Sequence, residues 1–428
     1  MTSLKSVRHA IFERYFIALE HRDFRTIWWA NITGGAAAWA LIVARGWLAY
    51  KLSGGSSAQV GLTTFMAMVP LFIVPPFIGV LADRMDRRKL LGWTYGINLA
   101  HNVILAALAL TGVIQIWHLL ALGFLNGVAR SASMTAMAAL VPNLVPRERL
   151  LNALSLNSAT FSASRLIGPG LIAPLMATVG AGGAFVLCTV FYAIGFYQVL
   201  QVRTTARGGV KAGENPIKAF TDGLAYTYRQ PLIRAAILIV AAHCGLTMAY
   251  ESLLPSLSAN ELNGGNTGFS VLMSGVGAGA LVGSLWIGGV HSAIGRGRAL
   301  LVLGILSGVA MLGIGFAPNL PLAIVAAAVA GAAQAAFMTI TQAISQALAD
   351  DRFRGRVASV VSFHIGGLMA LVNLANGSLA DVFHASTIFW VSGLIFAGLM
   401  VFTFATKVLR TVYLHGLPDV AMARAGAR

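Results

Sequence analysis

The sequence predicts an all-α integral membrane protein with twelve transmembrane helices, arranged as two related bundles of six. Of its 428 residues, 57% are hydrophobic and 10% are charged, whereas a soluble domain carries roughly 25% charged residues. Apolar stretches of about 20 residues, long enough to cross a hydrocarbon core, recur along nearly the whole chain. Segments of the first half also recur in the second half, which indicates an internal repeat.

The predicted spans form two sets of six, separated by a long polar gap. The first set covers residues 26–51, 58–82, 90–112, 117–140, 154–178 and 182–202. The second set covers residues 232–255, 268–291, 298–316, 320–345, 357–379 and 386–406. The resulting domains are a cytoplasmic amphipathic N-terminal segment (1–25), a six-helix bundle (26–202), a cytoplasmic linker with an amphipathic helix (203–231), a second six-helix bundle (232–406) and a cytoplasmic tail (407–428).

Two segments outside the spans have the pattern of amphipathic surface helices. In the N-terminal segment, the apolar residues with helical spacing are Ile11, Phe12, Tyr15, Phe16 and Leu19. In the linker, Asn215-Pro216 has the form of an N-cap followed by proline at the first helical position. The apolar residues with helical spacing that follow are Ile217, Phe220, Leu224 and Tyr228. Both patterns predict helices on the inner membrane surface.

The net charge is +16, and the distribution of the basic residues along the chain indicates the membrane topology. Basic residues gather in the N-terminal segment, the tail and alternate loops, and Lys51 is the only one in a predicted outward loop. This bias places both termini in the cytoplasm, as expected for a multi-pass protein of a bacterial inner membrane. The spread over short loops argues against nucleic-acid binding. Cys188 and Cys244 both fall inside spans, so they are small hydrophobic residues rather than a disulfide pair.

The internal repeat rests on three pairs of segments. The segment GVARSASMTAMAALV from Gly127 resembles GAAQAAFMTITQAIS from Gly331, at an offset of 204 residues. A weaker pair at an offset of 209 joins GVLADRMDRRKLL from Gly79 to GGVHSAIGRGRALL from Gly288. PRERLLNALS after span four also matches RFRGRVASVV after span ten. Many transporters build a central site between repeats of this kind.

The loop between spans two and three carries a recognisable motif. Residues 79–91 read Gly-Val-Leu-Ala-Asp-Arg-Met-Asp-Arg-Arg-Lys-Leu-Leu. This resembles the signature loop of the major facilitator superfamily, Gly-x-Leu-Ala-Asp-Arg-x-Gly-Arg-Arg-x-x-Leu, with Asp86 in place of the second glycine. A generic basic loop would explain Arg87 and Arg88, but not Gly79 and Asp83 at fixed places. Residues 144–170, 223–237 and 352–360 resemble the enterobactin-exporter and macrolide-efflux branch of that superfamily.

The resemblance implies a twelve-helix fold that works by alternating access, often in exchange for protons. Gly79 would let two helices approach closely. Asp83 would accept hydrogen bonds from the N-terminus of span eleven near Arg356. Arg84, Arg87 and Arg88 could then clamp carboxylates across the two halves.

One feature of this loop departs from the pattern of its relatives. They often pair the loop with an acid at the end of span four, but residues 130–146 contain no acid. Asp86 or Glu148 could take that place.

Four charged residues fall inside predicted spans: Arg45, Arg130, Arg165 and Glu251. A charge at this depth costs several kcal/mol and is usually functional. Glu251 is the only carboxylate clearly inside a span, which suits a reversible proton carrier. The alternative is a structural ion pair with Arg45, which lies at similar depth in span one. The two interpretations are compatible if the ion pair breaks when Glu251 is protonated.

Arg130 and Arg165 each have two interpretations. Arg165 precedes Gly168-Pro169-Gly170, which resembles the helix kink of exporters in this superfamily; it binds substrate or caps the carbonyls of a broken helix. Arg130 lies in span four, where proton antiporters of the superfamily often carry an arginine. It serves proton coupling or locks its helix to the loop of Asp83.

Several function classes lack support in the sequence. No Walker loop, hydrolase elbow or zinc-protease motif is present. The intramembrane histidines His101, His243 and His364 lack metal-ligand spacing. We therefore expect neither an enzyme nor a cofactor or metal.

The predicted function is secondary active transport, with protons, a small molecule and the lipid bilayer as partners of a monomer. We expect a proton-coupled exporter of drugs, siderophores or similar amphiphilic molecules. The alternatives are an importer or facilitator of a small solute on the same fold and, more remotely, a non-transporting membrane receptor.

Overall fold

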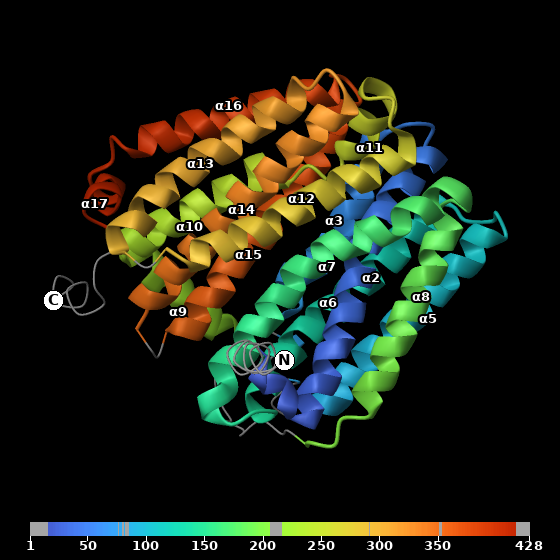
Figure 1. The fold of residues 1–428 in the computed structure, drawn as a ribbon, viewed down its shortest axis with the longest axis horizontal. Helices are drawn as coiled ribbons and strands as arrows, with labels where there is room; N and C mark the ends of the chain where they lie inside the picture. Colours follow the sequence, from blue (N-terminus) through green and yellow to red (C-terminus); the bar gives the residue numbers. More distant parts are fainter. Residues whose placement is uncertain are drawn as a thin grey trace, which may run out of the picture.

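The computed structural model describes residues 16–75, 77–78, 81, 85–205, 216–290, 292–350 and 353–416, which form helices joined by short loops (Figure 1). The first half contains η1 (Ile17–Glu20), α2 (Arg22–Leu52), α3 (Ser57–Ile73), α5 (Arg87–Leu110), α6 (Ile116–Leu140), η2 (Val141–Asn143), η3 (Arg147–Arg149), α7 (Leu150–Thr178) and α8 (Ala181–Leu200). After α9 (Pro216–Arg229), the second half contains α10 (Pro231–His243), η4 (Cys244–Met248), α11 (Leu254–Ser256), η5 (Leu257–Glu261), α12 (Gly265–Gly288), α13 (Ala293–Gly315), α14 (Leu320–Leu348), α15 (Arg354–Ala380), α16 (Ala385–Thr403) and α17 (Lys407–His415).

Nine helical segments of the described chain are long and apolar enough to cross a membrane. They are α2, α5, α8, α10 with η4, α12, α13, α14, α15 and α16. The helix α3 is apolar but shorter. The helices α6 and α7 are 25 and 29 residues long and carry Arg130 and Arg165. This chain is therefore a multi-pass membrane protein.

Polar side chains begin several of the helices. Asp86 caps α5 by accepting a hydrogen bond from the backbone N of Arg88, and Ser292 and Asn319 cap α13 and α14 in the same way. The helix α3 ends at Ile73, earlier than the predicted 82, although part of 74–82 lies outside the described residues. Val74 and Pro75 follow, and Pro75 has no N–H to continue the hydrogen bonding of α3.

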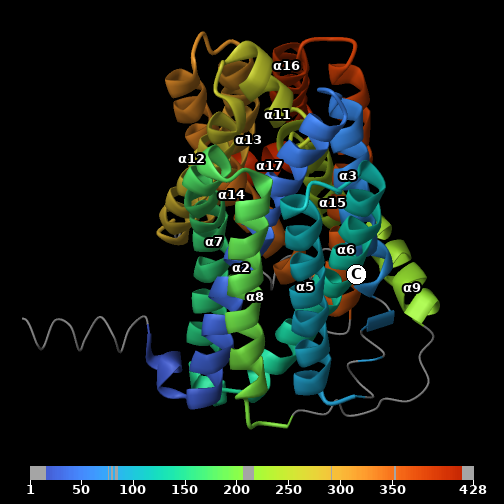
Figure 2. The same ribbon diagram turned by 90° about the vertical axis from the view of Figure 1, so that its right-hand side faces the viewer.

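The two halves are packed from similar helix pairs. In the first half, α3 packs on α6, and α5 packs on both α6 and α8. In the second half, α12 packs on α14, and α13 packs on both α14 and α16. Figure 2 shows α2, α8 and α5 side by side along the first half. The halves meet through two further pairs, α7 with α12 and α3 with α15.

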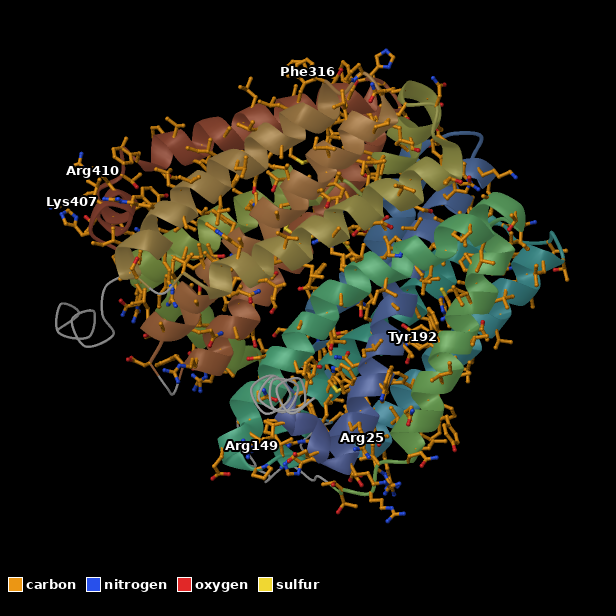
Figure 3. All side chains as sticks on the ribbon, viewed as in Figure 1. Arg25, Arg149, Tyr192, Phe316, Lys407 and Arg410 are labelled. Carbon is orange, nitrogen blue, oxygen red and sulfur yellow. The ribbon has the colours of Figure 1, made fainter. Side chains whose placement is uncertain are left out.

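The molecule has two distinct ends, which we name after residues labelled in Figure 3. The Phe316 end holds the C-terminus of α13 and the loops between α2 and α3 and between α15 and α16. The Arg149 end holds Arg25 and Arg149 of the first half, while Lys407 and Arg410 lie where α17 packs on the beginning of α13. In Figure 1, α7 and α12 run together near α11 and diverge toward the Arg149 end.

Two amphipathic helices pack on the second half, both away from the Phe316 end. The predicted linker helix is confirmed as α9, which lies on α15: Phe220 meets Phe363, and Arg356 lies 3.6 Å from Asp222. The helix α17 buries Tyr413, whose hydroxyl lies 2.8 Å from that of Thr403. Burial raises the pKa of Tyr413. Most of the predicted N-terminal helix lies outside the described residues.

Candidate functional site

Four charged side chains predicted from the sequence come together between the two halves. Arg45 of α2, Arg130 of α6 and Arg165 of α7 belong to the first half, and Glu251 follows η4 in the second half. The positive charges of all three arginines act on Glu251. We call these four residues the central charge cluster. Arg45, Arg165 and Glu251 are buried, with exposed fractions of 5%, 9% and 7%, and Arg130 is half-buried.

An aromatic ring holds two of the arginines. The guanidinium carbons of Arg165 and Arg130 lie 5.0 Å and 5.9 Å from the centre of the Trp39 ring. The face of an indole ring attracts cations, so Trp39 offsets part of the repulsion between the two guanidinium groups. Because Trp39 is buried in α2, this attraction acts with little screening by water.

One hydrogen bond joins the cluster across the halves. Nη2 of Arg165 donates to the hydroxyl of Tyr250 at 3.0 Å. That hydroxyl lies 3.5 Å from Oε1 of Gln334 in α14, at the outer limit for a hydrogen bond. Arg165 therefore links α7 to the segment that carries Glu251.

Three charged atoms of the cluster have no hydrogen-bond partner among the described residues. They are Nη1 of Arg45, Nε of Arg165 and Oε2 of Glu251, all buried. An unpaired buried charge is costly, and such atoms are usually satisfied by water, an ion or a ligand. The cluster therefore has unused capacity to bind a charged or polar group.

The segment that carries Glu251 is not the continuous helix predicted over 232–255. The helix α10 ends at His243, η4 is a π-helix, and residues 249–253 are not helical. Broken helices inside a membrane need partners for the freed backbone groups, and they commonly form the binding sites of transporters. The break places Tyr250 and Glu251 at the junction of the halves.

Amide side chains from two other helices stabilise this break. Gln334 of α14 donates to the carbonyl of Thr247 at 2.6 Å, and Asn376 of α15 donates to the carbonyl of Ala249 at 2.7 Å. Asn373 accepts from the backbone N of Ser252 at 3.2 Å. These amides cap the backbone groups that the break in the helix leaves free.

A second junction of the halves lies at the Phe316 end, between α3 and α15. Asp381, directly after α15, accepts hydrogen bonds from the backbone N of Ser57 at 2.5 Å and of Ala58 at 3.2 Å, and from the hydroxyl of Ser56 at 2.6 Å. A carboxylate at a helix N-terminus is favoured by the helix dipole. We call this contact the Asp381 latch.

The helices at the latch touch backbone to backbone. A Cβ at Gly61 would lie 2.7 Å from the carbonyl oxygen of Asn373, and a Cβ at Gly377 would collide with the carbonyl of Ser57. This junction was not predicted, although the sequence carries a signal for it. Residues 377–381 read Gly-Ser-Leu-Ala-Asp, which repeats the Gly-x-Leu-Ala-Asp of residues 79–83.

The signature loop is only partly described. Gly79, Asp83 and Arg84 lie outside the described residues. Arg87 donates to the carbonyl of Ala139 at 2.9 Å and to Oδ1 of Asn143 at 3.0 Å, and Arg88 donates to the carbonyl of Val202 at 2.7 Å. These bonds lie within the first half, whereas the sequence predicts a clamp between the halves. The neutral amide of Asn143 stands near the expected position of the missing acid.

Gly168 and Pro169, predicted to kink a helix, lie inside α7, which continues to Thr178. A Cβ at Gly168 would collide with the carbonyl of Ala36, so this glycine allows α7 to contact α2 closely. Pro169 has no N–H to give to the carbonyl of Arg165, four residues earlier. Gly277 of α12 packs against that same carbonyl. The kink stays a prediction.

The histidines do not extend the site. His243 lies 3.2 Å from the hydroxyl of Ser307 and stacks on Phe337, so it packs in the core of the second half. His101 is fully buried, and neither of its ring nitrogens has a hydrogen-bond partner among the described residues. In the same residues, no group of three metal-ligating side chains occurs.

Comparison with known proteins agrees with this architecture. The multidrug efflux pump Tap of Mycolicibacterium fortuitum is 26% identical over 83% of this chain and 88% of its own length. The enterobactin exporter EntS of Shigella boydii is 27% identical over 71% of this chain and 72% of its own length. The macrolide efflux protein A of Streptococcus pyogenes is 25% identical over 55% and 58%.

Solved structures share the fold at low sequence identity. A mutant of the nucleoside transporter NupG has a TM-score of 0.73 at 12% identity and covers 91% of this chain and all of its own. A bacterial homologue of the lysosomal transporter Spinster, solved in an inward-facing and unoccupied conformation, has a TM-score of 0.65 at 15% identity, with 92% and 97% covered.

The fold and the charged site between two helical halves define a membrane transporter of the major facilitator type. Residues 15–414 match the family of transmembrane secretion effectors, and the chain belongs to this family of exporters.

Proposed function

We propose that this chain is a proton-coupled exporter of amphiphilic small molecules that works by alternating access. It spans the inner membrane of a bacterium twelve times, as two six-helix bundles, and has both termini in the cytoplasm. The matching helix pairs of the two halves support the bundles. The basic residues gathered at the Arg149 end support the orientation.

The Asp381 latch supports alternation between two closed ends. It joins the first turn of α3 to the end of α15. The sequence predicts a matching contact at the other end of this helix pair, from Asp83 to the first turn of α15. In the present conformation the outer contact is closed. Export requires it to open while the inner contact forms.

The observation that carries the coupling is the buried carboxylate of Glu251. It sits at the helix break, beside three arginines of the other half, and its Oε2 has no hydrogen-bond partner among the described residues. Protonation removes its attraction to those arginines and so weakens one link between the halves. Arg45 is one of the three positive charges that act on this carboxylate, which is the proposed proton carrier. Arg130 and Arg165 complete the proposed coupling site.

The substrates we propose are drugs, siderophores or similar amphiphilic molecules. The printed activities of the relatives support this range, from multidrug and macrolide efflux to enterobactin export. The mostly apolar surroundings of a few charged groups suit such molecules.

Dye efflux in everted membrane vesicles tests the proposal. Vesicles with the wild-type protein should accumulate dye only while a proton gradient is present. Glu251→Gln should lower this uptake at least tenfold at equal protein abundance, as expected when a proton carrier is lost. Glu261→Gln, at the Phe316 end, is the matched control and should stay near wild type. Uptake that ignores the gradient, or full activity of Glu251→Gln, would refute the coupling.

A further inference from the structure

The central charge cluster carries more positive than negative charge. The positive charges of three guanidinium groups act on the single carboxylate of Glu251, so the formal charge of the cluster is +2. No other carboxylate balances it inside a described span. The remaining described acids lie at helix ends, in loops or on α9: Glu20, Asp23, Asp86, Glu148, Asp222, Glu261, Asp350 and Asp381.

The partners of the arginines leave this excess in place. Arg165 donates to the neutral hydroxyl of Tyr250, and Arg165 and Arg130 lie on the neutral ring of Trp39. Nε of Arg165 and Nη1 of Arg45 are buried without a partner among the described residues. Hydrogen bonds to a hydroxyl and contact with a ring stabilise a guanidinium group but do not neutralise it. The cluster therefore keeps an uncompensated positive charge.

We propose that the transported molecules carry an anionic group, a carboxylate or an acidic phenolate, which binds among Arg45, Arg130 and Arg165. This inference rests on the proposed export function and names the chemistry of its substrate. Guanidinium groups bind such anions through paired, charge-assisted hydrogen bonds. The rings of Trp39 and Tyr250 lie beside the arginines and contact the apolar part of the molecule. Glu251 competes with the anion for the same cations.

The competition gives the two kinds of charge opposite effects on binding. Removing a cation weakens the attraction for an anion, whereas removing the charge of Glu251 strengthens it. A variant that merely damages the fold would weaken binding in both cases. This difference in sign separates an anion site from a structural role of the same residues.

Two probes of similar size and apolar surface test the proposal: 4-biphenylcarboxylate, an anion whose oxygens accept hydrogen bonds, and 4-biphenylmethylammonium, a cation. Their binding to the full-length protein in neutral detergent is measured by equilibrium dialysis, after subtraction of the uptake by empty micelles. Wild type should bind the anion at least tenfold more tightly than the cation. Arg45→Gln and Arg165→Gln should each weaken anion binding about ten- to a hundredfold, the usual worth of one charge-assisted hydrogen bond. Glu251→Gln should tighten it.

Arg298→Gln is the matched control, because Arg298 is exposed near the beginning of α13. It should bind both probes as wild type does. Tighter binding of the cation to wild type, unchanged anion binding in both arginine variants, or weaker anion binding in Glu251→Gln would each overturn the proposal. The assay needs neither a gradient nor transport. Failure of proton coupling in vesicles would therefore leave its outcome unaffected.

Discussion

The carboxylate of Asp381 accepts a hydrogen bond of 2.5 Å from the backbone N of Ser57, the first residue of α3. These residues lie 324 positions apart and belong to different halves of the chain. The bond joins the end of one helix to the beginning of another that runs the opposite way. This exposed acid is thus one of the contacts that join the halves at the Phe316 end.

Replacing this acid should shift the balance between the two closed ends. Asp381→Asn loses the charge that favours the α3 N-terminus, which is worth about 1 kcal/mol at an exposed site and so about a fivefold shift. The measurement is the distance between spin labels on cysteines introduced at Lys51 and Val382. Cys188 and Cys244 are buried and should not react. The variant should populate longer distances, whereas Ser378→Ala on the same helix should not; an unchanged distribution in Asp381→Asn would remove the latch from the mechanism.

Two glycines of α15 should respond differently to the same change. A methyl group at Gly377 collides with the carbonyl of Ser57, whereas at Gly367 it meets no atom within 4 Å. Gly377→Ala should therefore separate α3 from α15 at the latch and lower transport severalfold, since the neighbour is rigid backbone. Gly367→Ala should transport as wild type does. Equal transport by the two variants, measured as dye uptake in vesicles, would contradict the close contact.

The amide caps of the helix break should contribute to stability. Gln334→Leu leaves the carbonyl of Thr247 without its 2.6 Å donor, and an unpaired buried carbonyl costs about 1–3 kcal/mol. Thermal unfolding of the purified protein in detergent should shift downward by several degrees. Gln342→Leu, the same change at an exposed position of α14, is the control. If the two variants have the same unfolding temperature, Gln334 does not stabilise the break.

The hydroxyl of Tyr250 should matter more than its ring. Tyr250→Phe keeps the packing but removes the 3.0 Å partner of Arg165, a bond to a charged group worth about 1.5–3 kcal/mol. Transport should fall about tenfold or more at unchanged abundance. Tyr197→Phe, on an exposed ring of α8, should have no effect. Wild-type transport by Tyr250→Phe would mean that Arg165 needs no link to the second half.

The sequence was most informative about charged residues inside the membrane. A charge in hydrocarbon has a high energetic cost and is usually kept for a function. This criterion selected Arg45, Arg130, Arg165 and Glu251, and the structure brings all four together. Most spans were likewise predictable, since apolar length alone specifies them.

The break after His243 could not be predicted in the same way. The side chains that bind the freed backbone groups lie between 87 and 127 positions away in the sequence: Gln334, Asn373 and Asn376. Local sequence patterns do not predict contacts over such separations. The Asp381 latch is a different case. Its Gly-x-Leu-Ala-Asp segment can be recognised in the sequence. Its role as a contact between the halves can be inferred only once α3 and α15 are known to be neighbours.

The attachment of α9 has a mechanical consequence. Tyr228 lies 3.0 Å from Nε2 of His364, and Phe220 packs on Phe363, so α9 travels with α15 as part of the second half. A movement of the first half against the second would therefore slide along the α3–α15 and α7–α12 contacts, while α9 would keep its place on α15.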